Sequence, residues 1–154
     1  MNMPGTPIIK RTTTDDPDFM ALIGQLDHEL WDELNEDQAT YDPFNKVPHL
    51  PTAIVVYVDD MPVASGCFKQ QDAGMVEIKR MYVAKSQRGK GISKMVLSEL
   101  ETWARDLGFQ YAVLETSVHF IVARSLYENA GYSITANYGP YVGLQDSVCF
   151  RKAL

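Results

Sequence analysis

The chain has 154 residues, of which 45% are hydrophobic and 22% are charged, a composition typical of one globular domain. Its 14 Lys and Arg residues against 20 Asp and Glu residues give a net charge of −6, which removes the usual electrostatic attraction to nucleic acid and to anionic lipid. The longest apolar runs, such as residues 53–58, are too short to span a bilayer. We therefore expect a single domain over residues 1–154, with no nucleic-acid partner and no membrane partner.

Cysteine and histidine usage indicates the compartment and argues against a metal site. Cys67 and Cys149 fit no CxxC pattern, which favours two reduced, buried thiols over a disulfide or a redox pair. No two of the 3 histidines have metal-ligand spacing, so no metal is expected. Residues 1–5 lack the basic start and the apolar stretch of a secretory signal. These features together predict a cytoplasmic protein.

Hydrophobic spacing in the first half predicts a helix followed by consecutive strands. Residues 7–14 are extended, and residues 15–17 supply an N-cap and a first-turn proline for an amphipathic, acidic helix. Residues 35–51 are a connector or a short second helix. An antiparallel meander then follows, with strands at 52–58, 63–69 and 74–83 and a turn at 59–62.

Helices and strands alternate in the second half. Apolar residues at helical spacing predict helices at 91–107 and 121–130, each followed by a glycine that would end it. Strands are predicted at 111–115, 132–135 and 147–152. A meander followed by alternating strands and helices predicts an α/β sheet with helices on its faces.

A basic segment from Arg88 to Lys94 lies between the last strand of the meander and the next helix. Free N–H groups and the helix dipole favour an anion at such a place, and Gly89 and Gly91 would let it approach closely. The segment therefore predicts a phosphate site. A solvated basic turn is the alternative, because the spacing fits neither the GxxxxGK[ST] loop nor GxGxxG.

Four segments resemble the GNAT superfamily of acetyl-CoA-dependent N-acetyltransferases, in that family's order and spacing. They are VEIKRMYV (76–83), RGKGI (88–92), LET (114–116) and ARSLYENAGY (123–132). The family pattern Gln/Arg-x-x-Gly-x-Gly/Ala falls on Arg88, Gly91 and Ser93, with serine where glycine or alanine is usual. The resemblance extends from about Thr52 to the C-terminus and implies a mixed, mostly antiparallel central sheet flanked by helices.

The resemblance also implies that acetyl-CoA binds as a co-substrate. The backbone of Met81, Tyr82 and Val83 would hold the acetyl carbonyl and the pantetheine arm, with that strand splayed from its neighbour. Many members have an asparagine that contacts the pantetheine where this chain has Phe120. The pyrophosphate would lie on the loop formed by Arg88, Gly89, Lys90, Gly91, Ile92, Ser93 and Lys94.

Tyr127 matches the tyrosine that in many family members protonates the departing coenzyme A thiolate. An aromatic side chain packed under the sheet is the alternative. Transfer also needs a neutral amine, and an amine with a pKa of about 10 is almost wholly protonated at pH 7, so a base or a water chain is required.

Glu77 is the predicted base. Strand alternation would place it on one face with Lys79, Met81 and Val83, and a glutamate at the matching place is the base in the histone-acetylating branch of the superfamily. Pairing of Glu77 with Lys79 or another cation is the alternative. Weaker candidates for the base are Glu115 and His119.

The sequence thus predicts an enzyme that moves the acetyl group of acetyl-CoA directly to a primary amine of a small molecule, without an acyl-enzyme. The alternatives are acetylation of a peptide or protein amine and a non-catalytic acyl-CoA-binding module. An acidic helix at 15–37, with Trp31, and an aromatic loop at 138–141 are either pocket walls for the amine or a solvated face and a turn. The oligomeric state is open, with a homodimer as one option.

Overall fold

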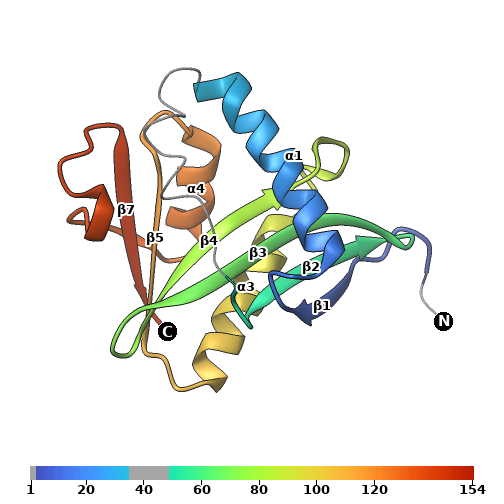
Figure 1. Cartoon of the computed structure of the whole chain (residues 1–154), viewed down its shortest axis with the longest axis horizontal. Helices are drawn as coiled ribbons and strands as arrows, with labels where there is room; N and C mark the ends of the chain where they lie inside the picture. Colours follow the sequence, from blue (N-terminus) through green and yellow to red (C-terminus); the bar gives the residue numbers. More distant parts are fainter. Residues whose placement is uncertain (1–2, 35–48) are drawn as a thin grey trace. The chain divides into compact units, whose positions relative to one another are not determined.

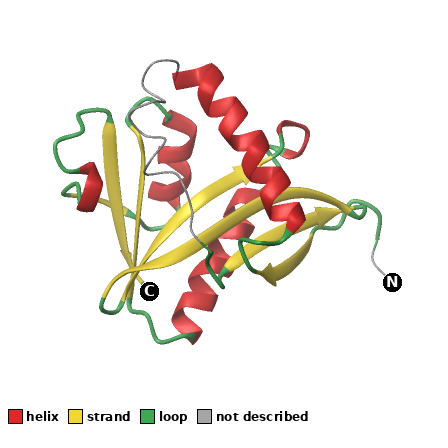
Figure 2. Cartoon of the chain, viewed as in Figure 1, coloured by secondary structure: helices red, strands yellow, loops and turns green. Residues whose placement is uncertain are grey.

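The computed structural model of the chain describes residues 3–34 and 49–154. Its elements are labelled in Figure 1 and separated into helices and strands in Figure 2. The strands are β1 (Ile8–Thr12), β2 (Ala53–Val58), β3 (Met61–Asp72), β4 (Met75–Val83), β5 (Tyr111–Ser117), β6 (Ser133–Thr135) and β7 (Ser147–Ala153). The helices are α1 (Pro17–Leu34), α3 (Ile92–Asp106) and α4 (Ile121–Asn129), with short 3₁₀ helices η1 (Lys85–Gln87) and η2 (Gly139–Tyr141).

The strands form one seven-stranded sheet in the order β1-β2-β3-β4-β5-β7-β6. The β4–β5 pair is parallel, whereas β1–β2, β2–β3, β5–β7 and β6–β7 are antiparallel. The predicted fold class, a mixed and mostly antiparallel sheet with helices, is therefore confirmed.

The chain divides into two compact units. The N-terminal unit comprises residues 1–68 and 80–100, and the C-terminal unit comprises residues 69–79 and 101–154. Strands β3 and β4 and helix α3 begin in one unit and end in the other. A single domain over residues 1–154 remains a prediction.

In the N-terminal unit, helices cover both faces of the strands. One buried cluster joins α1 to β2, β3 and β4, and consists of Phe19, Leu22, Ala53, Val55, Cys67 and Tyr82. The neighbour of Cys67 in β3, Gly66, lies instead against Val96 and Leu100 of α3. Because successive strand residues point to opposite faces, α1 and the first part of α3 cover opposite faces of β3 (Figure 1).

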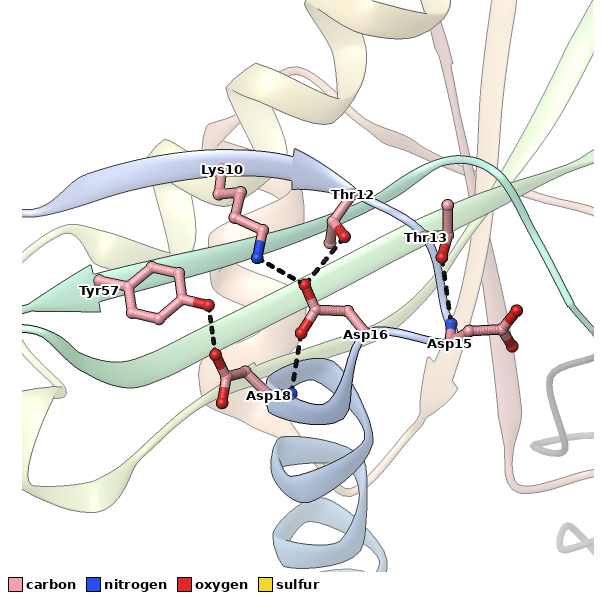
Figure 3. Close-up of polar contacts among 7 residues, drawn as sticks. All are labelled: Lys10, Thr12, Thr13, Asp15, Asp16, Asp18 and Tyr57. Carbon is pink, nitrogen blue, oxygen red and sulfur yellow. Dashed lines mark hydrogen bonds and ion pairs between the residues drawn. The ribbon is translucent and has the colours of Figure 1, made fainter.

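Asp16 starts α1 and ties it to strand β1 (Figure 3). One carboxylate oxygen accepts the backbone N–H of Asp18 at 2.8 Å, which is the predicted N-cap contact. The other oxygen accepts Lys10 Nζ at 2.7 Å and Thr12 Oγ1 at 2.9 Å. Burial on its own raises the pKa of Asp16, but these hydrogen bonds outweigh it and hold the pKa below its usual value. Side chains of β1 thus fix where α1 begins.

The turn between β2 and β3 is shorter than the predicted turn at 59–62, because β3 already begins at Met61. Asp59 and Asp60 have φ angles of 49° and 66°, so these two residues alone reverse the chain in left-handed backbone. Pro62 lies inside β3, near an irregularity in the β2–β3 pairing, where a missing N–H is tolerated.

The other predicted elements exist with shifted ends. Strands β3, β5 and β7 extend beyond their predicted ends to Asp72, Ser117 and Ala153, because pairing with neighbours rather than residue type decides where a strand stops. Most of the predicted connector at 35–51 lies outside the described residues. Within residues 3–34 and 49–154, no helix is both long and apolar enough to cross a membrane.

In the C-terminal unit, β5 lies between β4 and β7. Tyr127 of α4 packs on Phe150 of β7 with 6.1 Å between ring centroids, so α4 covers one face of these strands. Buried Glu101 accepts the Tyr132 hydroxyl at 2.8 Å and Lys152 Nζ at 2.9 Å. This pair of contacts joins the end of α3 to the segment after α4 and to β7.

The close approach at Gly66 gives a prediction about stability. A Cβ there would lie 2.8 Å from Val96 Cγ1 and 2.9 Å from Leu100 Cδ1, so Gly66→Ala forces both side chains to move. We expect a loss of about 1–3 kcal/mol in the free energy of unfolding. The matched control is Gly24→Ala in α1, where the new Cβ meets nothing within 4 Å and a gain of about 0.5–1 kcal/mol is expected. Urea unfolding measures both, and a Gly66→Ala protein as stable as the original would contradict the close packing.

Candidate functional site

The loop before α3 has the backbone of an anion site. Gly89 and Gly91 have φ angles of 79° and 80°, in the left-handed region that favours glycine. The helix bond from Met95 N–H to the Gly91 carbonyl is 3.2 Å long, and the N–H groups of residues 92–94 precede it as first-turn donors. Such donors and the helix dipole attract a phosphate. The predicted pyrophosphate residues thus lie together in the N-terminal unit.

Ser93 is the residue at which the chain departs from the family pattern. It lies in the first turn of α3, and its φ is not among the positive ones. A helical residue does not need the conformational freedom of glycine. The serine therefore leaves the backbone geometry of the loop intact.

The Arg88 side chain joins three elements of the N-terminal unit. Nη2 donates to Glu29 of α1 at 2.7 Å, and Nε donates to the Val83 carbonyl at 2.8 Å. The Tyr82 hydroxyl also donates to Glu29, at 2.8 Å. Burial alone raises the pKa of Glu29, but the hydrogen bonds from Arg88 and Tyr82 bring it below its usual value. Glu29 therefore offsets part of the positive charge predicted for the loop.

Strand β4 is interrupted at Arg80, whose φ of 59° is not that of an extended strand. Its guanidinium donates to Asp27 of α1, and its carbonyl accepts Ser65 Oγ at 3.2 Å. The alternation that predicts a shared face for Glu77 and Met81 therefore breaks between them. Among the described residues, no partner reaches the buried Arg80 Nε.

The parallel pairing of β4 with β5 stops early. It covers three positions and ends at Glu77 opposite Val113, although β5 continues to Ser117. Within the described C-terminal unit, the register of β4 with β5 therefore ends before Ile78. A strand separation of this kind is what the resemblance implies for the pantetheine arm, because it leaves backbone polar groups for a ligand.

Glu77 is buried, with partners from three elements of the C-terminal unit. Its Oε2 accepts the Tyr138 hydroxyl at 2.7 Å. Its Oε1 lies 3.5 Å from Lys79 Nζ and 3.7 Å from Lys69 Nζ, and its side chain is 3% exposed. The pairing with Lys79 that the sequence offers as an alternative is present, and Lys69 and Tyr138 add to it. The role of Glu77 as the base remains a prediction.

The aromatic loop at 138–141 is held against β4. Lys79 Nζ donates to the Tyr141 hydroxyl at 3.2 Å and lies 5.9 Å from the centre of that ring. The Tyr138 and Tyr141 rings meet edge to face at 5.5 Å. Burial, followed by the negative charge of Glu77, raises the pKa of both tyrosines well above their usual value. Both hydroxyls therefore stay protonated at neutral pH.

Glu115 differs from Glu77 in having few polar partners. Its Oε2 accepts a hydrogen bond from Ser147 Oγ at 3.3 Å. Burial raises the pKa of Glu115 to about 7, with the charge of Glu77 adding to the rise and Ser147 and Lys79 opposing it. A carboxylate that titrates near neutral pH suits proton transfer, so Glu115 stays a second candidate for the base.

Tyr127 combines a packed ring with an unengaged hydroxyl. The side chain is 7% exposed, with ring centroids 6.1 Å from those of Tyr132 and Phe150. Burial, and then the charge of Glu115, raises the pKa of Tyr127 well above its usual value. Across residues 3–34 and 49–154, no hydrogen bond joins this hydroxyl to another residue. Its proton is free for a ligand, and its catalytic role remains a prediction.

The remaining candidates are less informative. His119 is exposed and lies 3.5 Å from Asp146. Phe120 precedes α4 and provides no side-chain cap for it. The Trp31 side chain and residues 35–37, predicted as part of a pocket wall, lie outside the described part of the chain. In that described part, no group of three or more His, Cys, Asp and Glu side chains could hold a metal ion.

The sequence analysis did not identify two sets of contacts. One is the pairing of acidic residues of α1 with arginines, and the other is the contact of Lys69 on β3 with Glu77. Asp27 and Glu29 reach Arg80 and Arg88 across 53 and 59 residues of chain. Lys69 reaches Glu77 from the neighbouring strand. The acidic helix was interpreted either as a pocket wall or as a solvated face, and no spacing in the sequence could have identified these pairs.

Comparisons with known proteins agree with this geometry. A model of the acetyltransferase (GNAT) family matches residues 17–132. A crystal structure from Klebsiella pneumoniae, assigned as an acyl-CoA N-acyltransferase, superposes with a TM-score of 0.79 and 28% identity over 97% of this chain and 98% of that one. A structure from Bacillus anthracis, assigned as a streptothricin acetyltransferase and in complex with acetyl coenzyme A, has a TM-score of 0.57 and 20% identity over 70% of this chain and 71% of that one.

Among curated proteins, "Probable N-acetyltransferase 14" of Xenopus tropicalis is 36% identical over 104 residues. The match covers 64% of this chain and 49% of that protein, so the chain spans about half the length of this relative.

The loop geometry predicts the effect of Gly91→Val. A valine at a φ of 80° is strained, and its branched side chain obstructs an anion at the N–H groups. We expect the dissociation constant of coenzyme A to rise by about tenfold or more, measured by calorimetry. Gly108→Val at the other end of α3 is the control, because Gly108 also has a positive φ, of 92°, and open space around it. Equal affinity in a folded Gly91→Val protein would show that this loop does not bind the pyrophosphate.

Proposed function

Since the chain belongs to the acetyltransferase (GNAT) family, we propose that it transfers the acetyl group of acetyl-CoA directly to a primary amine of a small molecule. The observation that carries this proposal is the loop at 88–94, where two glycines of positive φ precede the N-terminus of α3. Main-chain donors there would bind the pyrophosphate of acetyl-CoA. The backbone of Met81, Tyr82 and Val83 would hold the acetyl carbonyl and the pantetheine arm.

The state of the cysteines supports direct transfer without an acyl-enzyme. Cys67 and Cys149 are both buried, and neither is in a disulfide. Burial raises the pKa of Cys149 to about 11, which disfavours the nucleophilic thiolate at neutral pH. Neither thiol therefore suits the role of an acetyl carrier. Two unlinked cysteines also support a reducing, cytoplasmic location.

A small cationic amine is supported by the charge and chemistry of the chain. The net charge of −6 favours cations over nucleic acid or an anionic membrane surface. Glu115 and Tyr138, which are both partly exposed, offer a carboxylate and an aromatic ring, and such groups recognise ammonium groups. Glu77 would serve as the base and Tyr127 as the acid that protonates the coenzyme A thiolate.

The test is to incubate the protein with acetyl-CoA and a panel of amines and to follow free thiol. Release of thiol only when a small amine is present supports the proposal. Thiol release with peptides alone would move the substrate class to peptide amines. Tight binding of coenzyme A without turnover on a broad panel would identify a non-catalytic binding module.

The packing of Tyr127 predicts that Tyr127→Phe lowers turnover and leaves stability nearly unchanged. The ring, which packs on Phe150, stays in place, and no hydrogen bond between the lost hydroxyl and another residue is found in the part of the chain that the structure describes. Because a coenzyme A thiolate with a pKa of about 8.5 is already a good leaving group, the loss should be only about 10- to 10³-fold. Steady-state kinetics and thermal unfolding measure the two effects.

The control for Tyr127→Phe is Tyr132→Phe. The Tyr132 hydroxyl donates to buried Glu101 at 2.8 Å, so its removal should lower stability rather than turnover. The assignment of Tyr127 as the acid fails if Tyr127→Phe keeps full turnover.

A further inference from the structure

Glu77 is placed where it cannot touch an acceptor amine itself. Its side chain is 3% exposed, and both of its carboxylate oxygens have protein partners within 3.7 Å. A proton reaches a carboxylate buried to this extent through a hydrogen-bonded neighbour. The identity of that neighbour decides how a base at Glu77 could work.

The neighbours of Glu77 differ in their ability to pass a proton. As ammonium groups, Lys69 and Lys79 only donate. Tyr138 and Tyr141 both present a hydroxyl to Glu77, and a hydroxyl both donates and accepts. The Tyr141 hydroxyl is buried and already accepts Lys79 Nζ at 3.2 Å, which leaves Tyr138 as the neighbour that can accept a proton from a substrate. A carboxylate only accepts, so the 2.7 Å contact fixes the hydroxyl hydrogen toward Glu77 and leaves the phenol lone pairs for another donor. Tyr138 is also less buried than Glu77.

Building on the proposed function, we propose that the Tyr138 hydroxyl takes a proton from the acceptor amine and passes its own proton to Oε2 of Glu77. As the nitrogen bonds to the carbonyl carbon, one N–H bond breaks and an O–H bond forms at Tyr138. The original O–H bond breaks, and Glu77 becomes a neutral acid. The C–S bond then breaks, and the thiolate takes a proton from Tyr127. Glu77 later releases its proton along the same route to solvent, which also reprotonates Tyr127.

The surroundings of Tyr138 favour a concerted exchange. Burial and the charge of Glu77 raise the pKa of Tyr138 well above its usual value, so a separate phenolate is costly and the two proton transfers coincide. The nitrogen becomes more acidic as it bonds to carbon and gains positive charge, which makes a carboxylate a sufficient final acceptor. The other titratable groups near Glu77 are Lys69 on β3, Lys79 on β4, Glu115 on β5, Tyr141 of η2 and Cys149 on β7.

The test is a double-mutant cycle of Glu77→Gln, Tyr138→Phe and both together, assayed on the amine that supports thiol release. Each single change should lower kcat/KM by about 10²- to 10⁴-fold near neutral pH, with partial recovery at higher pH as the amine loses its proton. The double variant should lose no more than the worse single variant, because both remove the same route. Affinity for coenzyme A should stay close to that of the unaltered protein. The thermal midpoint should fall in all three variants, because each one disturbs the contacts of buried Glu77, so the rates are compared at a temperature where every variant is folded.

Tyr111→Phe is the matched control, because Tyr111 is a partly exposed tyrosine of the same unit whose ring lies 4.1 Å from the Arg151 guanidinium and which is not among the hydrogen-bond or ion-pair partners of Glu77. It should keep the original rate and pH profile. A normal rate and pH profile for Tyr138→Phe beside a defective Glu77→Gln would overturn the relay, as would losses that multiply in the double variant. Absence of transfer to any amine by the unaltered protein would instead overturn the proposed function itself.

Discussion

Strand β4 stops pairing with β5 after Glu77 and Val113, although both strands continue. Backbone N–H and C=O groups need partners, and a buried one left without any costs about 1–3 kcal/mol. Beyond this point, water or a bound ligand must therefore supply the hydrogen-bond partners that β5 does not provide. An extended ligand that itself carries amides, such as pantetheine, would meet this need, and the end of the β4–β5 pairing is therefore consistent with the proposed binding of acetyl-CoA.

In each unit, the partners of the charged side chains affect the chemistry that those side chains can perform. In the N-terminal unit, Glu29 and Asp27 of α1 engage Arg88 and Arg80, which shifts the recognition of phosphate toward main-chain donors. In the C-terminal unit, two lysines flank Glu77, while Glu115 has far fewer partners. Two carboxylates in one cluster thus have different environments. In enzymes, such a difference allows two carboxyl groups to take different roles in proton transfer.

Local features of the sequence were enough to predict the elements and the anion loop. Helical spacing and the glycines at 89 and 91 depend on a few neighbouring residues, so they were predictable from the chain alone. The contacts that define the Glu77 cluster were not, because Tyr138 and Glu77 are 61 residues apart. Side-chain alternation along β4 was also a poor guide to which residues share a face. The positive φ of Arg80 could not be recognised from the sequence, because arginine is an ordinary residue in a strand.

The bridge from Glu29 to Arg88 has a thermodynamic consequence. It connects α1 to the loop that precedes α3 through hydrogen bonds of 2.7 and 2.8 Å, with Val83 and Tyr82 as further members. A helix and a loop joined in this way do not move independently. An anion that bound the loop and drew Arg88 away from Glu29 would therefore weaken the attachment of α1 to the loop. By linkage, the attachment of α1 would then oppose the binding of that anion by the same free energy.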